Sequence, residues 1–415
     1  MKVLVKNISE IATPLGFEKK CGKSMKDIKV YKNAYILIED GVIVEVAEGK
    51  FDESGFTGDI IDAENKAVIP GFCDSHTHFI FGGYRDEEYD MRLKGASYME
   101  IQEAGGGIKS TVAATREESF DTLYEKGLDR LDSMLSMGVT TVEGKSGYGL
   151  DIENELKQLD VMEKLDSVHA LDIVKTYMPA HDVPFEYKDN KEGYIDLMIN
   201  KGIPSAKGKA TFFDIFTEKG IFEIEESRRL LQAAKDAGFK LKLHADEIVD
   251  IGGGYLAGEM GAVSADHLLM ANDKSINKMI EAGTIQTLLP VTAFSLNADY
   301  ARARVMIDNG GAVALGSDFN PGSCHSNSIS LMIALATIYM KMTIEETLTA
   351  LTLNGAAAMG REKEVGSIEE GKLADLVILD KDRYKFLSYT IGVNIVEKVI
   401  KRGELVYDKK QAYID

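Results

Sequence analysis

Two histidines at the end of an apolar run are the residues in this sequence best suited to chemistry. The run Val68–Asp74 is followed by His76-Thr77-His78. On an extended strand, side chains two positions apart share a face and lie about 6–7 Å apart along the backbone. His76 and His78 can therefore converge on one metal ion, with Asp74 on the same face. A single histidine on an apolar face is more often a structural core residue, and it is the pair that favours a metal site.

Eight apolar runs between residues 68 and 362 alternate with helix-like stretches, and they are the elements that must position these residues. Alternation of this kind is typical of βα units with a parallel sheet. It predicts an α/β fold, a (β/α)8 TIM-type barrel. A doubly wound sheet is the alternative, because a strand count does not show closure. The long gap after the first run predicts extra helices. The runs are Val68–Asp74, Thr140–Glu143, Ile173–Met178, Phe212–Thr217, Lys240–His244, Ala262–Asp266, Ile285–Leu289 and Ala312–Gly316.

Most of the histidines directly follow these runs. In a barrel, the carboxyl ends of all strands open on one face, where the active site lies. Glu247 comes shortly after the fifth run, and Asp318 follows the eighth. We therefore expect a metal centre on that face. Five of the seven histidines follow the first, third, fifth and sixth runs: His76, His78, His181, His244 and His267.

The residue types in this set indicate hydrolytic chemistry. Neutral imidazoles with one carboxylate suit Zn²⁺ or Fe²⁺. Such an ion lowers the pKa of a water from about 15.7 to about 7, which suits attack on an amide or amidine carbon. Glu247 can take the proton of this water, and His267 can stabilise the oxyanion. A buried structural histidine is the alternative for His267. The expected metal ligands are His76, His78, His244 and Asp318.

Both ends of the chain contain short β-rich segments and turns. Examples are Val3–Val5 and the hairpin around Glu39-Asp40-Gly41 at one end, and Ala374–Leu379 and Asn394–Ile400 at the other. Chain termini often lie close together. We therefore expect residues 1–67 and 363–415 to form one composite β-domain, a small β-sandwich, beside a hydrolase barrel of residues 68–362.

The composition is that of an ordinary soluble globular protein. Its 48 basic and 67 acidic residues give a net charge of −19, which repels nucleic acids and anionic membranes as partners. No apolar run approaches the roughly 20 residues that span a bilayer. Charge interrupts the apolar residues of Met1–Asn7 early, so we expect no signal peptide. Three widely spaced cysteines without a Cys-x-x-Cys motif favour a cytoplasmic location over a disulfide framework.

Other motifs receive structural interpretations. The G-x-G-x-x-A match at Gly252–Ala257 does not lie in a first βα turn, so we interpret it as a loop and helix start. Ala104–Gly107 is either a mobile lid or a plain turn. Cys324 lies several residues beyond the eighth run and is not counted as a ligand. His169 and His325 are interpreted as structural or surface residues.

These motifs are similar to those of the amidohydrolase superfamily, and within it to the imidazolonepropionase family. The strand-end His-x-His and Asp318 carry the broader resemblance. Narrower motifs carry the closer one, and it covers nearly the whole chain. They comprise residues 76–85, 105–108, 145–150, 244–248, 264–270 and 317–323.

The resemblance implies a fold, a reaction and a set of contacts. The fold is a metal-bearing barrel with a β-domain from both termini. The reaction is hydrolysis of the lactam ring of 4-imidazolone-5-propanoate to N-formimino-L-glutamate. One Zn²⁺ or Fe²⁺/Fe³⁺ ion per subunit is implied, with catalytic roles for Glu247, His267 and Asp318, and a homodimer. The implied substrate contacts are Arg85, Tyr148, His181, Glu247, Asn320, Gly322 and Ser323.

Arg85 and Lys145 have alternative interpretations. Arg85 offers the planar fork that a carboxylate prefers, but a surface salt bridge with one of the acidic residues 86–88 is the alternative. Many binuclear amidohydrolases bridge two metal ions with a carbamylated lysine after strand 4. Lys145 follows the second run, whereas the fourth leads to Glu218. We therefore expect one metal ion.

The sequence departs from the family pattern at several positions. Gly144, Pro179 and Val291 stand where the family has Ala, Gly and Gly, and residues 324–327 are unusual. None of these positions is an expected ligand or substrate contact. Two alternatives remain: a sister amidohydrolase, such as an aromatic deaminase or another cyclic amidase, and a non-catalytic barrel that serves as an assembly scaffold.

Overall fold

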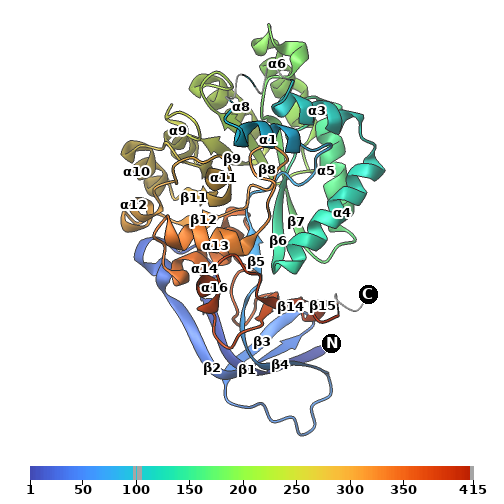
Figure 1. Ribbon diagram of the computed structural model, residues 1–415, viewed down its shortest axis with the longest axis vertical. Coiled ribbons are helices and arrows are strands. Elements are labelled where there is room, and N and C mark those ends of the chain that lie inside the picture. The colour runs from blue at the N-terminus through green and yellow to red at the C-terminus, as the bar shows by residue number, and fades with distance from the viewer. Residues whose placement is uncertain (97–99, 101–104, 412–415) are drawn as a thin grey trace.

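The computed structural model describes residues 1–96, 100 and 105–411. It consists of a barrel surrounded by helices and a smaller sheet below it, in which both ends of the chain meet (Figure 1). Part of the lid or turn predicted at Ala104–Gly107 lies outside the described residues. Within the described ranges, no helix has both the length and the apolar character needed to cross a membrane.

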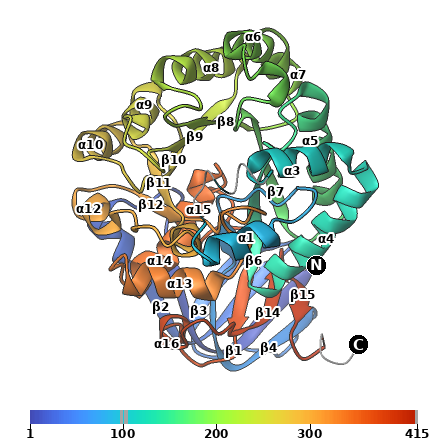
Figure 2. The same ribbon diagram turned by 45° about the horizontal axis from the view of Figure 1, so that its top comes forward.

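Each of the eight predicted runs overlaps one strand of a single parallel sheet. These strands are neighbours in chain order, as in a (β/α)8 barrel. Their surrounding helices form a ring around them (Figure 2). The strands are β5 (Phe72–Asp74), β6 (Val139–Lys145), β7 (Asp172–Ala180), β8 (Phe212–Thr217), β9 (Lys240–Ala245), β10 (Ser264–His267), β11 (Ile285–Leu288) and β12 (Val313–Leu315).

The barrel closes just beyond the ends of its first and last strands. Thr77 forms a parallel bridge with Phe319. The Asp318 amide donates to the His76 carbonyl, and the His78 amide donates to the Phe319 carbonyl, both at 2.9 Å. The predicted barrel is thus confirmed, and the doubly wound alternative is wrong. This closure also brings the candidate ligands of the two strands side by side.

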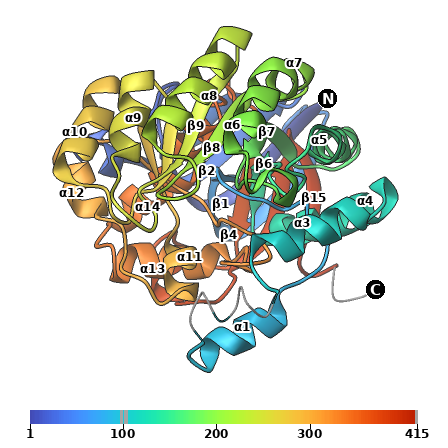
Figure 3. The same cartoon turned by 90° about the horizontal axis from the view of Figure 1, so that it is seen from above.

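Helices fill the connections between the strands. The long connection after β5 carries three described helices, as its length predicted, and α1 projects from the ring (Figure 3). Gly238 ends α8 in a left-handed conformation, with φ of 98°. The helices of the barrel are α1 (Asp86–Leu93), α3 (Ile108–Glu117), α4 (Phe120–Ser136), α5 (Ile152–Asp166), α6 (Lys191–Leu197), α7 (Ile203–Ser205), α8 (Ile224–Ala237), α9 (Gly253–Met260), α10 (Asp273–Ala282), α11 (Pro290–Ser295), α12 (Ala303–Asp308), α13 (Ile329–Ile338), α14 (Ile344–Leu351) and α15 (Leu353–Ala358).

The two ends of the chain form one small β-domain, as predicted. It is a continuously hydrogen-bonded sheet of seven strands, with β13 antiparallel to β4. Buried apolar side chains from both ends, including Val3, Ile36 and Leu376, form its core. Its strands are β1 (Lys2–Pro14), β2 (Ile28–Glu39), β3 (Val42–Glu48), β4 (Asp59–Pro70), β13 (Leu376–Leu379), β14 (Val396–Lys401) and β15 (Glu404–Asp408), and the short helix α16 (Phe386–Tyr389) lies between β13 and β14.

The apolar run at 68–74 is divided between the two sheets. Its first part pairs with β13 as the end of β4, and β5 begins at Phe72. Pro70 has no amide hydrogen to continue a ladder. Gly71 lies so close to β6 that an added Cβ would be 2.3 Å from the Thr140 hydroxyl. This point is therefore where the chain passes from the small sheet into the barrel.

Candidate active site

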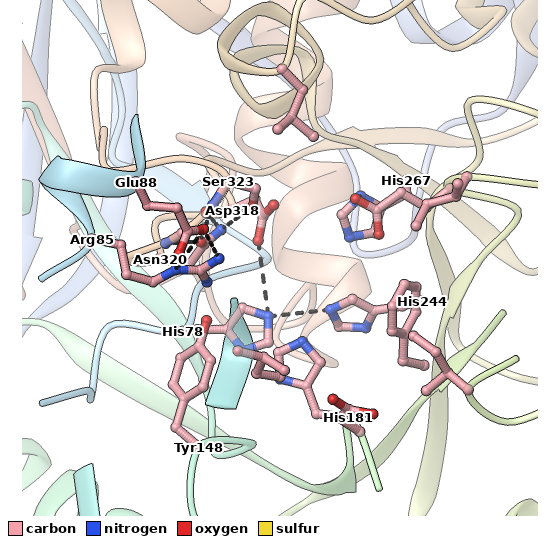
Figure 4. Close-up of a pocket in the computed structure, with 18 of the residues that line it drawn as sticks. His78, Arg85, Glu88, Tyr148, His181, His244, His267, Asp318, Asn320 and Ser323 are labelled. Carbon is pink, nitrogen blue, oxygen red and sulfur yellow. Dashed lines mark hydrogen bonds and ion pairs between the residues drawn. The ribbon is translucent and has the colours of Figure 1, made fainter. Parts of the chain in front are cut away.

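Three imidazoles and one carboxylate converge at the carboxyl ends of the strands. Figure 4 shows His78, His244 and Asp318 of this group. His78 Nε2 lies 3.2 Å from His244 Nε2. Asp318 Oδ1 lies 3.5 Å from His76 Nε2 and 3.9 Å from His78 Nε2. The ligand atoms of the three histidines all lie within 4.8 Å of one another. The residues expected to bind a metal thus come together from the end of β9 and from the segments that follow β5 and β12.

Each of these imidazoles has an oxygen atom beside its Nδ1. A carboxylate or carbonyl oxygen only accepts hydrogen bonds, so this arrangement favours a proton on Nδ1 and leaves the Nε2 lone pair free. His76 Nε2 is buried and has no hydrogen-bond partner among the described residues. That state fits a nitrogen that binds a metal ion. The Nδ1 distances are 2.6 Å from His76 to Asp266, 3.1 Å from His244 to Asp214 and 3.4 Å from His78 to the Ser146 carbonyl oxygen.

Burial keeps the imidazoles of His76 and His78 neutral. It is the largest cause that lowers the pKa of His76 and of His78 well below 6.5. Burial also raises the pKa of Asp318 to about 6. Neutral imidazoles are the form that binds Zn²⁺ or Fe²⁺, and a divalent cation would favour the ionised form of the carboxyl group.

Asp318 and His267 lie where the backbone takes unusual conformations. Their φ angles are 52° and 73°, in the left-handed region that residues other than glycine rarely adopt. The carboxylate of Asp318 accepts a hydrogen bond from the Thr292 hydroxyl at 2.7 Å. Such conformations persist where the surroundings fix them, and they cluster at active sites.

Glu247 and His267 lie next to each other beside the four candidate ligands. Glu247 Oε1 lies 3.5 Å from His267 Nδ1. Burial raises the pKa of Glu247 to about 8, with further contributions from Asp318 and Glu218, and it lowers the pKa of His267 well below 6.5. Glu247 can therefore accept or donate a proton near neutrality, whereas His267 is neutral. Neither ring nitrogen of His267 has a hydrogen-bond partner among the described residues.

A cavity of about 350 Å³ opens in front of these side chains. Its size falls in the range typical of small-molecule sites. All seven residues expected to contact the substrate line it, together with His78, His244, His267 and Asp318. His76 lies behind them and is fully buried. The seven are Arg85, Tyr148, His181, Glu247, Asn320, Gly322 and Ser323.

Arg85 is paired with Glu88 inside this cavity. Its Nε lies 3.1 Å and 3.0 Å from the two carboxylate oxygens of Glu88. The side chains are only 14% and 9% exposed, so the pair is not a surface salt bridge. An added Cβ on Gly322 would lie 2.0 Å from an Arg85 nitrogen, and only glycine leaves room for the guanidinium there.

Arg92 also lines the cavity, and the sequence analysis missed it. One of its guanidinium nitrogens donates to the Gly322 carbonyl at 3.0 Å. The other is buried and has no hydrogen-bond partner among the described residues. The signal for it was helical spacing, because Arg85, Glu88 and Arg92 are three and four residues apart and share one face at α1.

A loop after β12 lies beside Arg85 and Arg92 and completes this wall. Asn320 orders this loop, since its Oδ1 accepts hydrogen bonds from the Gly322 and Ser323 amides at 2.8 Å and its Nδ2 donates to the Ser323 hydroxyl at 2.8 Å. Across the cavity, the His181 ring stacks on His78 with 4.9 Å between ring centroids. Burial lowers the pKa of His181 to about 3, so the ring is neutral.

Several other residues singled out in the sequence have structural roles. Asp74 accepts hydrogen bonds from the Ser317 amide and hydroxyl, at 2.8 Å and 2.6 Å, and so joins the first strand to the last. The Cys324 thiol donates to the Ser317 carbonyl, and all three cysteines are free. Gly252–Ala257 forms a loop and the start of α9, as predicted, with the Gly253 amide bonded to Asp246.

Comparisons with known proteins agree with this site. A model described as "Amidohydrolase family" matches residues 59–127 and 128–407. The chain is 56% identical over 414 residues to the imidazolonepropionase of Clostridium tetani, covering 98% of each chain. It is 54% identical over 411 residues to the imidazolonepropionase of Parabacteroides distasonis, covering 97% of this chain and 98% of that one.

Solved structures share the fold at low sequence identity. One is a guanine deaminase from C. acetobutylicum with bound guanine, with a TM-score of 0.72, 17% identity, and coverage of 98% of this chain and 100% of that one. Another is an adenosine deaminase from Xanthomonas campestris with bound zinc, with a TM-score of 0.71, 17% identity, and coverage of 99% and 96%. At this identity, the likeness shows a shared barrel with a second sheet.

Proposed function

This chain belongs to the imidazolonepropionase family of amidohydrolases, and we propose how its residues perform that family's reaction. The reaction is hydrolysis of the lactam C–N bond of 4-imidazolone-5-propanoate, which gives N-formimino-L-glutamate. The observation that carries the proposal is the convergence of His76, His78, His244 and Asp318 at the base of a cavity whose wall holds Arg85.

One divalent metal ion fits the base of the cavity. His76, His78, His244 and Asp318 would hold it, and this donor set suits Zn²⁺ or Fe²⁺. When bound, such an ion supplies a Lewis acid that makes water nucleophilic near neutral pH. Lys145 supports a single ion, because its ammonium lies 2.7 Å from Asp214 Oδ2 and 3.0 Å from Glu143 Oε1 and so is an ion-pair partner there.

Glu247 transfers the proton in the reaction, and His267 donates a hydrogen bond. A water oxygen adds to the lactam carbonyl carbon, the C–N bond breaks, and the ring nitrogen leaves with a proton. Glu247 accepts the proton from the water and returns it to that nitrogen, a role suited to its raised pKa. His267 donates a hydrogen bond to the developing oxyanion from a ring nitrogen that lacks a partner among the described residues.

Arg85 anchors the propanoate group of the substrate. The overall charge of −19 opposes an anionic substrate, so a local cationic group must bind it. Arg85 and Arg92 each bring a guanidinium group into the cavity, which is also lined by the carboxyl groups of Glu88, Asp182, Glu247 and Asp318. Tyr148 and Ser323 add hydroxyl groups to the same wall, and Asn320 and Gly322 shape it. A purine deaminase has no need of such an anchor.

The location and the oligomeric state of the protein are also part of the proposal. Its three free cysteines fit a reducing cytoplasm, and its substrate is a small anion rather than a nucleic acid or a membrane. The assembly proposed is a homodimer. Light scattering of the purified protein measures this directly, since a dimer has twice the chain mass of 45.5 kDa.

A substrate panel tests the proposal. Protein loaded with Zn²⁺ or with Fe²⁺ is given 4-imidazolone-5-propanoate, guanine and hydantoin in separate assays. We expect turnover of the first, with N-formimino-L-glutamate as product. His169→Ala is the matched control, because this histidine pairs with Asp132 outside the cavity, and it should keep full turnover. Loss of ammonia from guanine, with no turnover of the imidazolone, would make the protein a deaminase instead.

A further inference from the structure

Five charged side chains form a fully buried cluster beneath the candidate metal ligands. They come from four neighbouring parts of the barrel, β6, β8, β9 and β10, and each is 0% exposed. No step of the proposed reaction uses them. Charges are placed so deep only when they are paired and hydrogen-bonded. The five residues are Glu143, Lys145, Asp214, Lys242 and Asp266.

Lys145 lies at the centre of this cluster. Its ammonium is 2.7 Å from Asp214 Oδ2, 3.0 Å from Glu143 Oε1 and 3.5 Å from Asp266 Oδ2. Burial lowers the pKa of Lys145, but the three carboxylates raise it by more, so the side chain is charged. Lys242 differs, because among the carboxylates of the cluster it contacts only Glu143, at 2.7 Å.

Two of the three oxygen atoms that contact Lys145 also contact imidazoles. Asp266 Oδ2 lies 2.6 Å from His76 Nδ1, and Asp214 Oδ2 lies 3.1 Å from His244 Nδ1. The second oxygen of each carboxylate is also fixed. The Ser264 hydroxyl donates to Asp266 Oδ1 at 2.7 Å, and the Ile215 amide donates to Asp214 Oδ1 at 2.7 Å. One ammonium group therefore connects two carboxylates, and each carboxylate contacts one imidazole, through a hydrogen bond at His76 and an ion-pair contact at His244.

We infer that Lys145 is a positioning residue for the metal centre, which holds Asp214 and Asp266 so that His244 and His76 direct Nε2 towards one ion. This inference rests on the metal centre of the proposed function. A carboxylate–imidazole contact raises the basicity of the ligand and fixes its tautomer. Two carboxylates buried together repel each other, and the ammonium between them offsets this repulsion and holds both oxygen atoms beside the imidazoles.

Lys145 also explains why this cluster does not need a second metal ion. His76, Glu143 and Asp266 lie close enough together to hold a metal ion. The Lys145 ammonium already contacts both of these carboxylates, at 3.0 Å and 3.5 Å. The Lys242 ammonium contacts that of Glu143 at 2.7 Å. Lysine ammonium groups thus supply the positive charge beside these two carboxylates.

Zinc affinity measured by competition with a chelator tests the inference without using the enzyme reaction. Lys145→Met should bind Zn²⁺ roughly 10- to 100-fold more weakly than the wild type, the usual effect of losing a partner behind a metal ligand. Lys242→Met is the matched control, since it also removes a buried ammonium but leaves both imidazole-bound carboxylates paired. Its zinc affinity should stay within about threefold of the wild type, well below that effect. The absorption bands of bound Co²⁺ should shift in Lys145→Met and not in Lys242→Met.

A double variant keeps the test decisive if Lys145→Met does not fold. Lys145→Met/Glu143→Gln removes one positive and one negative charge and leaves Asp214 and Asp266 in place, and it should still bind Zn²⁺ weakly. Wild-type affinity in a folded Lys145 variant would overturn the inference and leave the proposed function intact. Equal weakening by Lys145→Met and Lys242→Met would also overturn it. A wild-type protein that binds no Zn²⁺, Fe²⁺ or Co²⁺ would overturn the metal centre itself.

Discussion

Replacement of Arg85 by alanine tests how the cavity binds an anionic substrate. The Arg85 guanidinium lies in the cavity wall next to Gly322 and forms an ion pair with Glu88. Arg85→Ala removes the proposed contact with the substrate carboxylate and leaves the metal ligands untouched. This contact is similar in the ground state and the transition state, so its loss should act on KM.

The size of the effect follows from the geometry of the pair. Hydrogen bonds to charged groups contribute roughly 1.5–3 kcal/mol each. Two nitrogens of Arg85 already face Glu88, which leaves about one charge-assisted contact for the substrate. Because about 1.4 kcal/mol corresponds to a tenfold change, KM should rise roughly 10- to 150-fold. We expect kcat to change much less.

Steady-state kinetics with 4-imidazolone-5-propanoate measures both parameters. The Glu88 carboxylate is left without Arg85 in this variant and repels the substrate, so Arg85→Ala/Glu88→Gln should recover part of the lost affinity. Arg229→Ala is the control, because this exposed arginine pairs with Glu192 on the outer surface. An unchanged KM in Arg85→Ala, or a loss confined to kcat, would refute the proposed anchor.

Three further changes probe the ligands, the base and the cavity wall. His244→Ala should remove metal retention and turnover together, and full turnover in this variant would contradict the ligand set. A protonated Glu247 cannot accept a proton, so kcat/KM should fall as the pH falls through its pKa. That pKa is raised to about 8 by burial and is lower once a cation is bound. Glu247→Gln should abolish this fall of kcat/KM at low pH. If the fall remains in the variant, another group is responsible for it. Gly322→Ala places a Cβ 2.0 Å from an Arg85 nitrogen and should raise KM with little loss of thermal stability, whereas an unaltered KM would mean that the guanidinium is free to move.

The parts of the site that follow a short-range pattern were predictable from the sequence. His76 and His78 share a face because side chains alternate along extended backbone, and they flank Thr77, which bridges to Phe319 at the seam of the barrel. His181, His244, His267 and Asp318 follow predicted strands, and parallel strands of a barrel end on one face. The fold class, the extra helices after the first strand and the small β-domain from both ends followed from the same kind of pattern.

The remaining parts depend on contacts between distant residues. Asp74 shares the face of His76 and His78 on the strand, yet its carboxylate bonds to Ser317, 243 residues away. The contact from Asp266 to His76 spans 190 residues. Closure of the sheet rests on the bridge from Thr77 to Phe319. No local periodicity encodes such pairings, so they are found only once the chain is folded. Glu88 shows the same limit, because its sequence position fits a surface salt bridge but it lies in the cavity.

Metal reconstitution tests the central claim most directly. Protein stripped with a chelator is titrated with Zn²⁺ or Fe²⁺, and the rate of N-formimino-L-glutamate formation is measured at each ratio of metal to protein. Four ligands around one centre predict no activity in the stripped protein, a linear rise to one equivalent per chain and no further rise beyond it. Full activity without metal, or a rise that continues to two equivalents, would contradict a single metal ion held by His76, His78, His244 and Asp318.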